Sequence, residues 1–230
     1  MISISSAARE RNAIIKMSLS NVQKFGETFD RNLQECKWEP HPLYSVFTQY
    51  DQEYYLERRV AFLHKYRCLY AVSKTISPKI IIELGTSAGA SADAYLSASP
   101  QATYIGYDIF AENGDRDDSP PWKPDEIARK LFKARGFKDY QLIRIDLRAL
   151  DKLPRRADFV VVDAGHDFDS EYSDLRLALT AEPVFIFVDD SGAEAKPAIE
   201  KFLSEDLKGR LAYTFPINYI GGGLVIKLVA

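Results

Sequence analysis

The stretch Ile80-Ile81-Ile82-Glu83-Leu84-Gly85-Thr86-Ser87-Ala88-Gly89-Ala90-Ser91 predicts the centre of the fold. An apolar run ends in an acid, two glycines follow four residues apart, and small residues lead into Asp93-Ala94-Tyr95-Leu96. This pattern is typical of a buried parallel strand, a tight turn, and a helix whose first backbone N–H groups face a ligand. We therefore expect a ligand site at this turn.

Length and composition limit the classes of protein that need to be considered. The 230 residues suit one large domain or a domain with an added helical segment, and 46% apolar residues supply a full core. A net charge of -3 gives no basic excess for nucleic acid or an anionic membrane. The two cysteines show no disulfide or metal-ligand pattern, and neither a signal peptide nor a membrane-length apolar run is present. We expect a cytoplasmic protein with reduced thiols.

From Lys79 onward, short apolar strands alternate with amphipathic helices, which predicts a doubly wound, Rossmann-like α/β sheet that is mostly parallel. Helices are expected near 89–98, 125–135, 168–181 and 194–206. The connection 216–223 is too short for a parallel crossover, so the last strand should be antiparallel. The seven predicted strands are Ile80–Leu84, Thr103–Tyr107, Gln141–Ile145, Phe159–Val162, Val184–Val188, Leu211–Phe215 and Leu224–Leu228.

Residues 1–76 form a separate helical segment in this interpretation, and residues 77–230 form the ligand-binding domain. Helices are expected around 13–22 and over Glu53–Thr75, where they would cap the sheet, wall the pocket and offer a contact for a homodimer. The polar stretch 112–122 follows the second strand and is either a lid that places Trp122 over the substrate or a solvated surface loop.

The glycine spacing separates several nucleotide ligands. A phosphate loop needs a lysine that this turn lacks. A dinucleotide fingerprint needs glycines where Ser87 and Ala90 stand. The remaining pattern, E-x-G-x-x-x-G-x-S, suits a ligand with an amino-acid carboxylate and a ribose, and S-adenosylmethionine has both. A glycine turn without any ligand is the alternative.

Specific roles follow for the residues of this turn. Gly85 would permit close approach of the methionine part, and Gly89 would let the helix start close to it. Ser91 would donate to the ligand carboxylate near the helix N-terminus. Asp108 ends the second strand, where an acid can accept both ribose hydroxyls.

A group of acids follows two other strands. Asp163 comes after Phe159–Val162, and Asp189 and Asp190 come after Val184–Val188, so all three should reach the ligand edge of the sheet. Their mutual repulsion would be relieved by a hard divalent cation such as Mg²⁺, which can favour the alkoxide of a substrate hydroxyl. His166 is within plausible reach as a general base. The alternative is that these acids and His166 cap helices or shape turns.

These residues resemble a known family. The turn 83–91 resembles the first motif of class I S-adenosylmethionine-dependent methyltransferases and is closest to the cation-dependent O-methyltransferases. The run 162–175 resembles the D-G-x-H-x-Y-x-x-x-x-x-D-L signature of the macrocin O-methyltransferase-like group, with Ala164-Gly165 in place of Gly-x and Phe168 in place of tyrosine. Val188-Asp189-Asp190 matches its acid pair. The resemblance spans residues 79–229 and does not cover 1–76.

The resemblance implies a site and a reaction. Asp163, Asp189 and Asp190 would hold magnesium, and His166 and Asp163 would be catalytic, His166 falling where catechol-type relatives carry a lysine base. The acceptor would be a natural-product or phenolic hydroxyl of a small molecule. The residues implied in cofactor binding are Glu83, Gly85, Thr86, Ser87, Gly89, Ser91, Asp108, Asp146 (by the adenine) and Asp163.

Three other functions stay open at this point. The chain could be a metal-independent N-, C- or O-methyltransferase with His166 as base, or a non-catalytic interaction module on the same fold. A nicotinamide oxidoreductase is disfavoured by the missing glycines. Side chains that could line an aromatic acceptor pocket are Tyr44, Phe47, Tyr50, Tyr54, His64, Trp122 and Tyr219.

Overall fold

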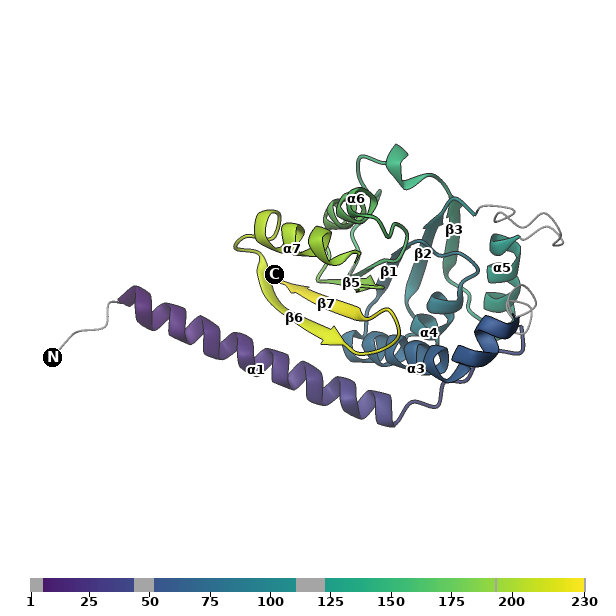
Figure 1. Cartoon of the computed structure of the whole chain (residues 1–230), viewed down its shortest axis with the longest axis horizontal. Coiled ribbons are helices and arrows are strands. Elements are labelled where there is room, and N and C mark those ends of the chain that lie inside the picture. Colours follow the sequence, from purple (N-terminus) through teal and green to yellow (C-terminus); the bar gives the residue numbers. More distant parts are fainter. Residues whose placement is uncertain (1–5, 44–51, 111–122, 193, 230) are drawn as a thin grey trace.

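The three-dimensional structure is a computed structural model of the chain (Figure 1). It describes residues 6–43, 52–110, 123–192 and 194–229, and the side chains of the first two helices from Leu19 and Val60 onward. The stretch predicted as a lid or surface loop, including Trp122, lies outside the described residues. So do the expected pocket residues Tyr44, Phe47 and Tyr50, and the side chain of Tyr54.

A single seven-stranded sheet forms the centre of the molecule, with strand order β3-β2-β1-β4-β5-β7-β6. The first five strands pair in parallel, whereas β7 runs antiparallel to both of its neighbours, β5 and β6. The prediction of a doubly wound sheet with an antiparallel last strand is confirmed. The strands are β1 Ile80–Leu84, β2 Thr103–Asp108, β3 Tyr140–Arg144, β4 Phe159–Val162, β5 Phe185–Asp189, β6 Leu211–Ile217 and β7 Gly223–Leu228.

The helices begin and end at residues with clear local causes. Pro124 opens α5 and left-handed Gly136 ends it, while the Asp167 side chain caps α6 by accepting from two backbone N–H groups. A short 3₁₀ helix after β3 was not predicted. The helices are α1 Ser6–Gln34, α3 Gln52–Ile76, α4 Ala90–Ala98, α5 Pro124–Arg135, η1 Leu147–Ala149, α6 Phe168–Leu179 and α7 Lys196–Glu205.

Helices cover both faces of the sheet (Figure 1). Alternate strand residues such as Ile81 and Phe187 pack against α1, α3, α4 and α5, and their neighbours Ile82 and Val188 pack against α6 and α7. Leu69 of α3 is fully buried in the first of these clusters. Phe25 and Phe29 of α1 and Leu69 of α3 therefore belong to the core that supports the sheet.

The carboxyl ends of β1, β2, β4 and β5 meet at one edge of the sheet, because these strands are parallel. The turn 85–89, Asp163 and Asp190 directly follow these strands, and Asp108 and Asp189 are the last residues of β2 and β5. The topology therefore brings the predicted site residues to one edge. Among the described residues, no helix is long and apolar enough to cross a membrane.

Candidate active site

The glycine turn after β1 is held in a strained but well-bonded conformation. Gly85 has φ +96° and donates its N–H to the Tyr107 carbonyl at 2.8 Å, and Gly89 has φ +79° at the start of α4. Ser87 adopts φ +47° without being glycine, and its N–H donates to Asp108 Oδ2 at 2.8 Å. The turn that follows β1 is therefore hydrogen-bonded directly to the carboxyl end of β2.

The structure supplies a packing reason for both glycines that differs from the predicted ligand approach. A Cβ at Gly85 would lie 2.1 Å from the backbone oxygen of Asp163. A Cβ at Gly89 would lie 2.9 Å from the Phe132 ring and 3.1 Å from the Ala128 Cβ, both on α5. Close contact between protein segments, rather than contact with a ligand alone, excludes side chains here.

Beneath the turn, Glu83 is fully buried and both of its oxygens are bonded within the protein. Ser91 Oγ donates to Glu83 Oε1 at 2.6 Å, and the Tyr104 hydroxyl donates to Oε2. Tyr104 also contacts Thr86 Oγ1 at 3.0 Å. Burial raises the pKa of Glu83 to about 8. Glu83, Thr86 and Ser91 were predicted to touch the cofactor; here their side chains bond to each other or to Tyr104, so they support the turn from below.

A cavity of about 490 Å³ opens above the turn at the carboxyl edge of the sheet. Asp108 is oriented on its wall because Oδ1 accepts from the Phe110 N–H at 2.5 Å while Oδ2 accepts from Ser87. Its neighbour Ile109 is 55% exposed and offers an apolar side chain on the wall of the cavity. The lining residues are Gly85, Ser87, Asp108, Ile109, Pro124, Asp146, Leu147, Arg148, Asp163, Ala164, Gly165, Ser170, Ser173 and Asp174.

Asp146, which the resemblance places by the adenine, lines this cavity and has a partner within the protein. Its carboxylate accepts from the Arg148 backbone N–H at 3.0 Å and from the guanidinium at 2.6 Å, and these bonds lower its pKa. Arg148 also lines the cavity and was not singled out in the sequence. The Asp-x-Arg spacing at a strand end was its only signal.

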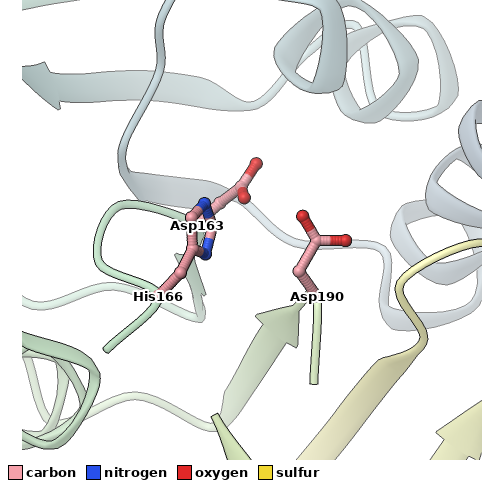
Figure 2. Close-up of side chains that lie close together, drawn as sticks. All are labelled: Asp163, His166 and Asp190. Atoms are coloured by element: carbon pink, nitrogen blue, oxygen red, sulfur yellow. The ribbon is translucent and has the colours of Figure 1, made fainter. Parts of the chain in front are cut away.

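Three side chains that follow the ends of β4 and β5 lie close together (Figure 2), and one of them, Asp163, lines the cavity. One ligand atom from each of Asp163, His166 and Asp190 lies within 4.8 Å of the other two. His166 is exposed, while the two carboxylates are partly buried. Burial and the neighbouring Asp189 carboxylate raise the pKa of Asp163 well above its usual range and also raise that of Asp190. Their environment therefore disfavours two free carboxylates here.

Asp189, the third predicted metal ligand, lies apart from this group. It is buried on the same face of β5 as Phe187, and its Oδ2 forms an ion pair with Lys65 of α3 at 3.0 Å. Its Oδ1 accepts from the Tyr219 hydroxyl at 2.6 Å and from the Asp190 N–H at 2.8 Å. Lys65 was not recognised in the sequence, because nothing local to α3 indicates a partner in β5. Tyr219, which was expected in an acceptor pocket, donates its hydroxyl to Asp189.

The helix-capping alternatives for these residues are wrong. Helix α7 has Ala195 at its N-cap without a side-chain cap, so neither Asp189 nor Asp190 serves it. Helix α6 is capped by Asp167 rather than by His166. A further acid, Asp174, accepts from the Gly165 N–H at 3.2 Å and steadies the loop that carries His166. His166 and Asp190 therefore have no capping role.

The donor set fits a divalent cation. The candidate ligands are Asp163, His166 and Asp190, so His166 takes the place that the sequence analysis gave to Asp189. Two ligand oxygens on opposite sides of Mg²⁺ are about 4.2 Å apart, so small side-chain rotations suffice for the Asp163–His166–Asp190 group. The imidazole widens the choice of ion toward Mn²⁺ and other transition metals. Asp163, Asp189 and Asp190 carry three negative charges against one on Lys65, which leaves the charge that one divalent ion balances.

Solved structures with the same architecture are methyltransferases. A methyltransferase from Podospora anserina, PaMTH1, crystallised with SAH, superposes over 100% of this chain and 99% of its own at TM-score 0.57 and 15% identity. The chain has a methyltransferase fold. A methyltransferase from Geobacter sulfurreducens (TM-score 0.58, 16% identity, 86% of this chain and 94% of that one) has the same fold.

A third structure with the methyltransferase fold is the SAM complex of the O-methyltransferase TomG from Streptomyces achromogenes, involved in tomaymycin synthesis. It has TM-score 0.57 and 17% identity over 85% of this chain and 93% of its own. Neither a family model nor a curated protein sequence matches this chain. The likeness therefore lies in the fold, and the chemistry has to be argued from the site.

Proposed function

We propose that this protein transfers a methyl group from S-adenosylmethionine to a hydroxyl of a small molecule, with a divalent cation at the acidic edge. One observation carries the proposal: a cavity with an oriented Asp108 opens directly beside the Asp163–His166–Asp190 group. A methyl donor and an activated hydroxyl need this adjacency, because methyl transfer requires the two reactants in line.

The cavity offers the contacts that the methyl donor needs. Asp108 would accept the ribose hydroxyls with the lone pairs that its backbone donors leave free. The exposed side chain of Ile109 and the nearby Leu147 would give the adenine an apolar surface, with Asp146 and Arg148 at its edge. Fold neighbours with SAH or SAM bound support this choice of ligand.

At the acidic edge, Asp163, His166 and Asp190 would hold the cation. Such an ion supplies Lewis-acid stabilisation of a substrate alkoxide or phenolate. The exposed His166 imidazole, if it is not a ligand, would accept the proton of the acceptor hydroxyl. The role of this chain is to orient the acceptor oxygen, to exclude water, and to hold the negative charge that develops.

A metal-independent methyltransferase is the second candidate, and Lys65 favours it. Its ammonium already lies 3.0 Å from Asp189 and 3.5 Å from Asp190, so part of the repulsion that suggested a metal is relieved within the protein. In that case His166 alone would take the proton.

Helix α1 extends well beyond the sheet (Figure 1) and could pair two copies of the chain, whether or not the enzyme uses a metal.

Binding of S-adenosylhomocysteine by calorimetry and transfer of labelled methyl to a panel of phenols and alcohols test the donor and the reaction. Asp190→Asn and a chelator should each lower turnover at least about tenfold, and added Mg²⁺ or Mn²⁺ should restore the chelated enzyme. Asp151→Asn, an exposed surface acid, is the control. Undiminished turnover in both conditions would eliminate the cation and leave the metal-independent enzyme.

A further inference from the structure

Lys65 is the one charged residue of the described α3 side chains that enters the acidic edge of the sheet. Its side chain is only 11% exposed, and its ammonium lies 3.0 Å from Asp189 Oδ2 and 3.5 Å from Asp190 Oδ1. It also stands over the Tyr219 ring at 5.7 Å. A lysine this buried needs compensating charge, and the two aspartates supply it.

Both oxygens of Asp189 are directed at groups of the protein rather than at the cavity. One oxygen holds Lys65, and the other accepts from Tyr219 and from the backbone of Asp190. Asp190, by contrast, is 39% exposed and reaches Asp163 and His166. The adjacent acids, which look equivalent in sequence, are therefore divided between two tasks.

A neighbouring contact joins α3 to the turn after β6. His64, next to Lys65, binds the Asn218 carbonyl through Nε2 at 3.2 Å. In that turn a Cβ on Gly221 would lie 1.8 Å from Asp190 Oδ1, so the backbone of the turn lies directly against this carboxylate. Asp190 is thus positioned from the α3 side and from the turn.

We propose that Lys65 is a positioning residue that withdraws Asp189 from the cation's ligands and sets how tightly the Asp163–His166–Asp190 group binds a divalent ion. The inference rests on the cation part of the proposed function. Lys65 lowers the affinity by its charge and by occupying Asp189. Without it, Asp189 would be free to add a third carboxylate to the site.

The net charge of the site gives the direction and size of the expected change in affinity for a divalent ion. Removing one positive charge from beside Asp190 should raise the affinity for a divalent ion on the order of tenfold or more. Removing Lys65 and the Asp189 charge together leaves the net charge of the site unchanged, so the affinity should return close to that of the wild type. Asp189→Asn alone should lower it by a similar factor.

The test is calorimetric titration of the full-length protein with Mn²⁺, checked by Mn²⁺ EPR, for the wild type, Lys65→Met, Asp189→Asn and the double variant. Lys208→Met is the matched control, because Lys208 is exposed just before β6, at the opposite edge of the sheet. We expect tighter binding only for Lys65→Met, weaker binding for Asp189→Asn, and near wild-type binding for the double variant and for Lys65→Arg.

Equal Mn²⁺ affinity of folded Lys65→Met and wild type would overturn the inference. Should Lys65→Met fail to fold, the double variant compared with Asp189→Asn measures the same loss of charge, and equal affinities there overturn it as well. If the wild type takes up no Mn²⁺, the cation part of the proposed function fails separately. Uptake by Lys65→Met would then still support the role of Lys65, and uptake by neither would refute it.

Discussion

Glu83→Gln should remove one identifiable contribution to the pH dependence of folding. Glu83 is fully buried under the glycine turn, and burial raises its pKa from the ordinary 4.5 to about 8, against the lowering effect of the Ser91 and Tyr104 hydrogen bonds. The nearby Asp189 and Asp108 carboxylates act in the same direction as burial. Between these two pH values the folded chain keeps a proton that the unfolded chain has lost.

The sign follows from this difference in bound protons. Because the folded pKa is raised, the protonated carboxyl stabilises the fold fully below about pH 4.5, and that contribution is lost as the pH rises toward 8. Each pH unit in this window costs about 1.4 kcal/mol, so between pH 5 and 7 Glu83 should lower the free energy of unfolding by about 2–3 kcal/mol. Glutamine keeps one acceptor and one donor for Tyr104 and Ser91 and does not titrate.

Urea unfolding at pH 5, 6, 7 and 8, with chelator and without methyl donor, measures this directly. The difference in stability between Glu83→Gln and the wild type should shift by about 2–3 kcal/mol in favour of the variant from pH 5 to pH 7. Glu205→Gln, on the exposed end of α7, should show no such shift. Parallel pH profiles for Glu83→Gln and wild type would refute a protonated Glu83.

Two further predictions concern the turn and the cavity. Gly85→Ala should destabilise the fold by at least about 2 kcal/mol, because it combines a left-handed φ with a Cβ 2.1 Å from the Asp163 carbonyl. Gly136→Ala, also at positive φ but with nothing within 4 Å of its Cβ, should cost only about 1 kcal/mol in the same urea titration, and equal losses would contradict the packing argument. Asp108→Ala should weaken S-adenosylhomocysteine binding at least about tenfold by calorimetry, with Asp151→Asn as control; unchanged affinity would remove Asp108 from the ribose site.

Local rules were sufficient for the order of elements. Alternation of apolar strands and amphipathic helices predicts each element of residues 79–229 to within two residues, η1 excepted. The short connection 216–223 predicts an antiparallel last strand, because no parallel crossover fits it. These signals depend on residues that are close together in the sequence, so they can be recognised without knowledge of the tertiary structure.

Local rules were insufficient for the orientation of individual side chains at the site. Asp189 follows Phe187 with a period of two, so it faces the helices α3 and α4 rather than the cavity. Asp190 lies beyond the end of β5 and has φ +51°, so its side chain does not follow the alternation of the strand. Two adjacent acids that look equivalent in the sequence therefore point to different partners.

By itself the sequence determined the seven-stranded architecture, the glycine turn after β1, and the presence of acids at strand ends. Only the tertiary structure decided which groups those acids contact. Lys65 stands 125 positions from Asp190, and no periodicity connects residues so far apart until α3 packs on the sheet. Close packing then places one ammonium among three carboxylates, and electrostatics divides them between the lysine and the candidate cation site.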